Sequence, residues 1–211
     1  MHEPVPGLLM ETFTPPEGAD DAWTDWYDEH RLKPRAALPG VIAARRGTAL
    51  IGSVPHVVVY DLADCTAPLS AAWRAADEEA GPAPDVLSGL QATLYRQIFS
   101  LHEGPYSPEP TPVLHTAIFE VPSRNQDEFN DWYNTEHAAF VRDVVEGYLN
   151  IRRFQGVLET HKFTAVYDVE DIANSHAKND HPQNYTPWAV RVRSKLPTFT
   201  ERRIWQVEAR A

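Results

Sequence analysis

Tyr133 and His137 are the residues whose types and spacing best suit chemistry. They lie four positions apart, so on a helix both side chains fall on one face. A neutral imidazole in apolar surroundings accepts a proton near neutral pH, and a tyrosine hydroxyl donates to a developing oxyanion. The pair therefore predicts proton abstraction beside a carbonyl, or elimination, with His137 as the base and Tyr133 as the acid or orienting group. The alternative is that His137 bonds a strand backbone and only seals the helix against a sheet.

Other aromatic and imidazole side chains are candidates for substrate contacts. Trp188 and Tyr185 lie beside a proline-containing break, where loop residues commonly form walls or lids. His115 lies in an expected strand, on one face with apolar residues, and is either a satisfied core residue or a pocket residue. The remaining candidates for substrate contacts are Trp132, Phe140, His30 and Tyr27. Each of them is either a core residue or a pocket residue, and aromatic residues at helical spacing are usually core.

Two arginine pairs, Arg45-Arg46 and Arg152-Arg153, each lie near the end of an expected strand. Consecutive strand residues face opposite ways, so one arginine of each pair points inward, where it could bind a carboxylate or phenolate. The favoured interpretation is an ion pair with Glu29 or Glu136.

The sequence predicts no metal and no cofactor. His176 and His181 are five apart, which is not a same-face helical pair, and the HxH, HExxH and CxxC patterns are absent. The markers of nucleotide binding and of serine hydrolases, GxGxxG, the P-loop and GxSxG, are also absent. Cys65 is the single cysteine, so no internal disulfide forms, which suits a reducing compartment.

Charge and composition narrow the partners. The chain has 211 residues, 43% of them hydrophobic, and a net charge of -11. An acidic chain disfavours nucleic acid and anionic membrane surfaces, because both select clustered Lys and Arg. Residues 1–7 lack an apolar secretion signal. We therefore expect a cytoplasmic protein with a small-molecule partner, and a homodimer stays open.

An internal repeat organises the chain. Matching residues recur at a nearly constant spacing of 106 to 107, although the second copy carries one extra residue after its tyrosine. The matches are Asp25-Trp26-Tyr27 with Asp131-Trp132-Tyr133, Glu29-His30 with Glu136-His137, Gly40 with Gly147, Arg45-Arg46 with Arg152-Arg153, Val59-Tyr60-Asp61 with Val166-Tyr167-Asp168, and Arg96 and Ile98 with Arg202 and Ile204. Since Trp, Tyr and His are rare, this predicts a duplicated domain.

Each copy predicts the order β-α-β-β-α-β, the ferredoxin-like arrangement. The first repeat is expected over 1–102, a linker rich in Pro and Gly over 103–112, and the second repeat over 113–211. The elements of the two copies, in order, are a strand (8–13, 113–121), a helix ended by Gly40 or Gly147, two strands (41–46 and 56–62, 148–154 and 162–169), a helical stretch (70–80, then 172–178 with 187–196) and a last strand (93–101, 201–207). Pro34 is expected to disturb the first helix. The fold class is α+β, with two antiparallel sheets packed face to face as an intrachain barrel.

The run Asp131-Trp132-Tyr133-Asn134-Thr135-Glu136-His137, followed by Gly147 and Arg152-Arg153, resembles the first-helix signature of EthD-like proteins in the dimeric α+β barrel superfamily. Trp188 resembles a tryptophan that such proteins carry before the last strand. The first copy departs from the pattern by the missing residue after Tyr27 and by lacking a counterpart of Trp188. The resemblance implies lyases, cyclases, decarboxylases, cofactor-free monooxygenases, haem enzymes or proteins of other roles.

Three functions follow. The leading hypothesis is a cofactor-independent enzyme of the lyase, dehydratase, cyclase or decarboxylase type that acts on a small apolar, aromatic or polyketide-like molecule. The second is a haem protein with a histidine ligand, and the third is a non-catalytic ligand binder. Because duplication lets one copy lose its pocket, the second copy is expected to be the working half.

Overall fold

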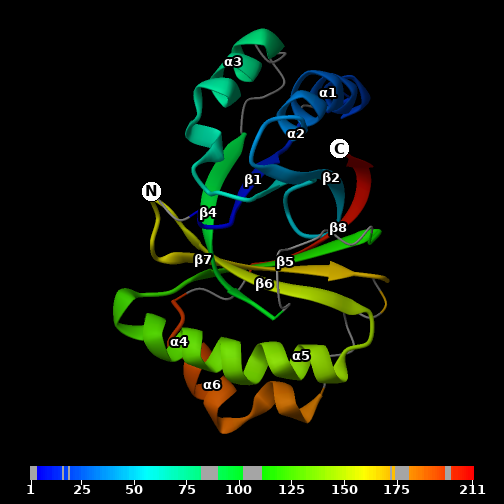
Figure 1. Ribbon diagram of the computed structural model, residues 1–211. Coiled ribbons are helices and arrows are strands. Elements are labelled where there is room, and N and C mark those ends of the chain that lie inside the picture. Colours follow the sequence, from blue (N-terminus) through cyan, green and yellow to red (C-terminus); the bar gives the residue numbers. More distant parts are fainter. Residues whose placement is uncertain are drawn as a thin grey trace. The chain divides into compact units, whose positions relative to one another are not determined.

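The computed structural model describes residues 4–15, 17–18, 20–81, 90–101, 111–171, 173, 181–197 and 201–211. They form two successive sets of elements, each in the predicted order (Figure 1). The first set is β1 (Gly7–Phe13), α1 (Asp20–Tyr27), α2 (Lys33–Ala36), β2 (Val41–Ile51), β3 (His56–Leu62), α3 (Ala71–Ala80) and β4 (Gln91–Ser100). The second is β5 (Val113–Glu120), α4 (Gln126–Trp132), α5 (Ala138–Val144), β6 (Tyr148–Gly156), β7 (Lys162–Val169), α6 (Pro187–Arg193) and β8 (Glu201–Arg210).

The strands follow the hydrogen-bonded order β1-β3-β2-β8-β5-β7-β6-β4 and close into an antiparallel barrel. This confirms the predicted α+β class and the barrel. β2 and β6 run farther than predicted; β6 is buried along most of its length, whereas β2 is buried only in its middle. The predicted linker lies almost wholly outside the described residues, as does the helical stretch expected over 172–178, and the repeat boundaries stay a prediction.

Two compact units divide the chain. Unit 1 comprises Met1–Arg96 with Trp205–Ala211, and unit 2 comprises Gln97–Ile204. β4 and β8 each begin in one unit and end in the other, which the sequence did not indicate. In unit 1 the end of the chain pairs with β2, where the backbones of Ala44 and Ala211 exchange two hydrogen bonds of 2.9 and 3.0 Å.

The first helical run of each unit covers one face of its own sheet. In unit 2 one face of the helix is buried against the sheet, through Phe129, Trp132, Tyr133, His137, Phe140 and Val141, while Val144 at its end is 36% exposed. Phe129 packs against Phe119 of β5 and Phe163 of β7, with ring centroids 5.1 and 5.6 Å apart. Figure 1 shows α4 and α5 as one continuous run along this sheet, with α6 beside it.

A π-helical turn interrupts each of these runs, at Asp28–Leu32 in unit 1 and at Tyr133–His137 in unit 2. The prediction that Pro34 disturbs the helix was wrong, because the run continues through Pro34 to Ala36. Pro34 lies at the start of α2, directly after the π turn, and Leu32 and Lys33 before it keep helical backbone angles. The second unit has the same wide turn without a proline, so proline does not cause it.

The arginine pairs do not bond to the glutamates expected for them. Arg45 donates to Asp61 over 2.9 Å, and both side chains are 2% exposed or less. Glu29 bonds Lys33 at the surface. The reason is the alternation of the strand: Arg45 points away from the helices and Arg46 toward them.

Within the described ranges, no helix has both the length and the apolar composition needed to cross a bilayer. The described side chains also hold no group of three or more His, Cys, Asp or Glu placed for a metal ion. His176 lies outside the described residues.

Asp61→Asn should destabilise the protein by about 3–5 kcal/mol, because it leaves the Arg45 charge buried without its carboxylate. Glu29→Gln is the matched control: its pair with Lys33 is exposed, so its loss should cost below about 1 kcal/mol. Urea denaturation of the full chain gives both values. Equal losses would contradict the assignment.

Candidate functional site

Tyr133 on the π turn and Tyr167 on β7 meet hydroxyl to hydroxyl between the helix and the sheet of unit 2. Their side chains are 1% and 0% exposed. Tyr133 also packs its ring on Phe119 of β5, with the centroids 5.6 Å apart. Two phenols that hydrogen-bond each other away from water form a pair of acid groups at the centre of the unit.

His115 joins this pair from the neighbouring strand. β5 and β7 place His115 directly opposite Tyr167, and the two rings stack with centroids 4.9 Å apart and planes at 24°. The Nδ1 atom of His115 lies 2.8 Å from the hydroxyl of Tyr148 on β6. The predicted histidine is therefore buried among tyrosines, with one ring nitrogen committed to a phenol.

His137 closes the π turn and lies beside the tyrosine that precedes it by four residues. Its ring centroid is 4.7 Å from that of Tyr133 and 5.0 Å from that of Trp132, and Phe140 follows at 6.2 Å. His137 is 9% exposed, more than either tyrosine of the pair. The structure thus places the predicted base and acid side by side, together with the predicted Trp132 and Phe140.

Arg153 lies on the other side of Tyr133. The guanidinium carbon stands 4.3 Å from the ring centroid of Tyr133 and 5.0 Å from that of Phe129. The β6 register places Arg153 opposite Ala165, and the side chain reaches the helix rather than the opposite face of the sheet. A cation over an aromatic face is attracted by the ring quadrupole, so Arg153 is held against the phenol.

Glu136 links the helix to Thr186, the residue before α6, by a hydrogen bond. It accepts hydrogen bonds from Trp132 Nε1 at 3.0 Å and from Thr186 Oγ1 at 2.6 Å, so the ion pair expected with Arg152 or Arg153 was wrong. Adjacent helix residues point about 100° apart, which turns Glu136 away from the sheet that carries both arginines. Thr186 also caps α6 by accepting from Ala189 N.

Trp188 and Tyr185 differ in their surroundings. Tyr185 is 58% exposed. Trp188 is half-buried in the first turn of α6, and its buried Nε1 has no hydrogen-bond partner among the described residues. Nearby, His181 packs on Phe140 with centroids 5.3 Å apart. This segment therefore borders the outer end of the helix that carries His137.

Burial sets the protonation of the phenols. It raises the pKa of Tyr133 to about 12, against the opposing effects of the hydrogen bond with Tyr167 and of the Arg153 and Arg193 charges. Burial, with the Tyr133 hydroxyl next, holds the pKa of Tyr167 well above its ordinary value. Both groups are neutral at pH 7, so the pair can donate a hydrogen bond or a proton.

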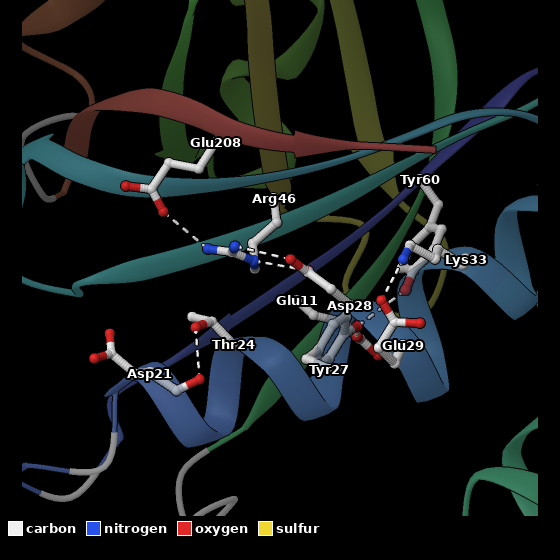
Figure 2. A network of polar contacts seen from close by, with 10 residues as sticks. All are labelled: Glu11, Asp21, Thr24, Tyr27, Asp28, Glu29, Lys33, Arg46, Tyr60 and Glu208. Atoms are coloured by element: carbon white, nitrogen blue, oxygen red, sulfur yellow. Dashed lines mark hydrogen bonds and ion pairs between the residues drawn. The ribbon is translucent and has the colours of Figure 1, made fainter.

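Unit 1 repeats the tyrosine pair with different neighbours. The hydroxyls of Tyr27 and Tyr60 are 3.0 Å apart, and Tyr27 donates to the buried carboxylate of Glu11 (Figure 2). Arg35 Nη1 lies 3.1 Å from each carboxylate oxygen of Glu11, while its Nε donates to Asp77 over 2.7 Å. A buried ion pair thus lies beside the phenols of unit 1, whereas His115 and Tyr148 lie beside those of unit 2.

His30 does not take the place of His137. It is exposed and packs on Trp26, with ring centroids 5.9 Å apart. It follows Tyr27 by three residues, whereas His137 follows Tyr133 by four, so the two imidazoles leave their helices in different directions. The predicted Tyr27 is fully buried, within the ion-pair network.

Sequence reasoning named one tyrosine of each pair and missed Tyr60, Tyr167, Tyr148 and Glu11. The spacing did contain a signal, because Tyr60 and Tyr167 recur 107 residues apart inside matching strands. Strand alternation alone could not show that these phenols face the helix tyrosines. Glu11 sits where the second copy has Ala117, so no repeat marked it.

Comparisons with known proteins support the fold. The chain matches a candidate monooxygenase of Fusobacterium nucleatum at 15% identity and a TM-score of 0.68, covering 99% of this chain and 95% of that one. An anthrone oxidase-like protein matches at 13% identity and a TM-score of 0.69, covering 100% of this chain and 94% of that one. A candidate chlorite dismutase matches at 14% identity and a TM-score of 0.63, covering 98% of this chain and 96% of that one. No family model and no curated protein matches the chain.

These likenesses extend over nearly the whole of each chain, so this protein shares the fold of these structures, and a further match is a ferredoxin-fold protein of Listeria monocytogenes. At such low identity they establish the fold alone. The activity has to be argued from the side chains of each unit.

Alkaline pH should destabilise the protein through these phenols. Unfolded tyrosine ionises near pH 10, whereas Tyr133 stays protonated in the folded state up to about pH 12, so its contribution to stability is present below pH 10 and lost as the pH rises toward 12. Tyr133→Phe should make the fall of unfolding free energy shallower in that window by about 1.4 kcal/mol per pH unit. Urea denaturation between pH 10 and 12 measures it, and an unchanged slope would contradict the assignment.

Proposed function

We propose that the protein is a cofactor-independent enzyme that performs acid–base chemistry on a small apolar, aromatic or polyketide-like molecule, with unit 2 as its working half. The observation that carries this is the contact of His137 with Tyr133, whose hydroxyl is in turn bonded to Tyr167. The EthD-like resemblance of the residues around this contact is consistent with lyase, dehydratase, cyclase or decarboxylase reactions.

In this proposal His137 removes a proton from a carbon next to a carbonyl. His137 is the more exposed of the two, at 9% against 1% for Tyr133, which suits a group that meets the substrate. The phenol pair stays protonated at neutral pH, because burial raises the pKa of both hydroxyls. It can therefore donate to the oxygen on which negative charge develops. Trp132 and Phe140 supply apolar walls beside the base.

Trp188 is proposed as a further substrate contact. Its indole N–H is a buried donor with no acceptor in the described part of the chain. A carbonyl or hydroxyl oxygen of a bound molecule would satisfy it, since an unmet buried donor is costly. Tyr185, which is exposed, would lie at the entrance rather than at the reacting atoms.

A haem site is the alternative, and the side chains fit it poorly. The ring of His115 is covered on one face by Tyr167, and its Nδ1 is bonded to Tyr148. His137 has the rings of Trp132 and Tyr133 within 5.0 Å. Titration with haemin should therefore leave the spectrum of unbound haemin, and a shifted Soret band that is lost in a His137→Ala variant would favour the haem protein instead.

The activity can be tested without knowing the natural substrate. Aromatic 1,3-dicarbonyl compounds have an acidic C–H next to a carbonyl, and its exchange with deuterium from solvent is read by proton NMR. The protein should accelerate exchange for at least one member of such a panel. His137→Ala should lower the rate by about 10²-fold or more, the usual contribution of a positioned base. Tyr133→Phe should lower it by a smaller factor.

His30→Ala is the matched control, since the corresponding imidazole of unit 1 is exposed. It should exchange at the rate of the unaltered protein. A folded His137→Ala variant with full activity would remove His137 from the role of base. Binding of the compounds without any exchange would point to a ligand-binding protein.

A further inference from the structure

Arg46 and Arg153, the arginines that point toward the helices, occupy the same position in the repeat but have different partners. In unit 1, Arg46 is held by carboxylates. Its Nε and Nη2 donate to Asp28 over 2.8 and 2.9 Å, and its Nη1 donates to Glu208 over 2.9 Å (Figure 2). Two negative groups therefore surround one cation, which satisfies the charge fully.

In unit 2, Arg153 is held by amides. Its Nη1 donates to Asn134 Oδ1 over 2.5 Å and its Nη2 to Asn130 Oδ1 over 2.8 Å. Within the ranges that the structure describes, no carboxylate pairs with it. The arginine is 1% exposed, so its charge is neither neutralised nor hydrated. Burial of such a cation is costly, and the protein keeps it in direct contact with Tyr133.

The two tyrosine pairs thus have opposite electrostatic surroundings. Tyr27 touches the negative Glu11, which opposes ionisation of the phenol even with Arg35 nearby. Tyr133 touches a positive group, which favours ionisation. The pKa values agree with these surroundings. Burial raises the pKa of Tyr133 to about 12, whereas burial together with Glu11 holds the pKa of Tyr27 well above its ordinary value.

We propose that Asn134 and Asn130 keep Arg153 without a carboxylate counterion so that its charge acts on the Tyr133–Tyr167 pair. Among the phenols of the two buried pairs, Tyr133 then gives up its proton most readily, and Asn134 is the residue that sets this readiness. Asn134 and Arg153 are positioning residues that act through Tyr133. In unit 1 the charge of the equivalent Arg46 is neutralised by Asp28 and Glu208.

Other charged and titratable groups also face Tyr133. The strands contribute Tyr167, Tyr148 and His115, and the π turn contributes His137. From α6, Arg193 approaches, but it is bound to Asn184 and lies over Trp132 rather than over Tyr133. Arg153 is therefore the cation closest to the phenol, and burial lowers the pKa of Arg153 itself to about 10.

A fluorinated tyrosine, which is more acidic than tyrosine, placed at position 133 or at position 27 reports ionisation by fluorine NMR while the chain is still folded. The midpoint at position 133 should lie below that at position 27. Asn134→Asp should raise the midpoint at position 133 by about one pH unit or more, because an adjacent carboxylate neutralises Arg153. Asn130→Asp places a carboxylate at Nη2 of Arg153 and should shift the midpoint at position 133 in the same direction.

Asp28→Asn is the matched control. It removes one of two carboxylates from Arg46, which does not contact Tyr27, so the midpoint at position 27 should not move. The inference is overturned if both aspartate variants fold, by circular dichroism, and leave the midpoint at position 133 unchanged. It is also overturned if position 27 ionises first.

This acidity does not depend on the proposed reaction. If no compound exchanges deuterium but the midpoint shifts as expected, the proposed function fails and the inference stands. If exchange is catalysed and Asn134→Asp changes neither the midpoint nor the rate, the inference fails and the proposed function stands.

Discussion

A buried hydrogen bond between a helix tyrosine and a strand tyrosine is the interaction on which the rest of each unit depends. It joins Tyr27 to Tyr60 and Tyr133 to Tyr167, with the helix run packed on the sheet around it. Phenols tolerate burial only when their hydroxyls are bonded, so each pair fixes the height and rotation of its helix. What differs between the units is the charge placed around the pair.

The charges around the two phenol pairs differ although the architecture of the two units is the same. In unit 1, Glu11 and Arg35 neutralise each other and bond both the phenol and the outer Asp77, an arrangement that stabilises but leaves little for a ligand to satisfy. In unit 2, imidazoles lie beside the phenol pair, and the arginine against Tyr133 is bonded by amides. A duplicated fold can thus retain its packing in both copies while the polar groups around its phenols diverge.

Much of the fold was predictable because repetition and periodicity are local signals. The matching tyrosines, histidines and glycines aligned the two copies, and runs rich in Val, Tyr and Thr defined strands such as β3 and β7 to the residue. The contact of Tyr133 with His137 followed from their spacing on one helix. The partners of Arg46 and Arg153 did not follow, because they depend on which strand residue faces which helix turn. Pairing of β8 with β2 joins residues far apart in sequence and left no local mark.

The shared π turn has a consequence for how this family of helices tolerates insertions and deletions. A helix advances about 100° per residue, so one residue added or lost rotates everything after it by that angle. A wide turn absorbs such a change locally. Both units have this turn, yet only the second has the additional residue between tyrosine and glutamate. The additional residue therefore coincides with a change in the imidazole that follows the glutamate, which is exposed in unit 1 and buried in unit 2.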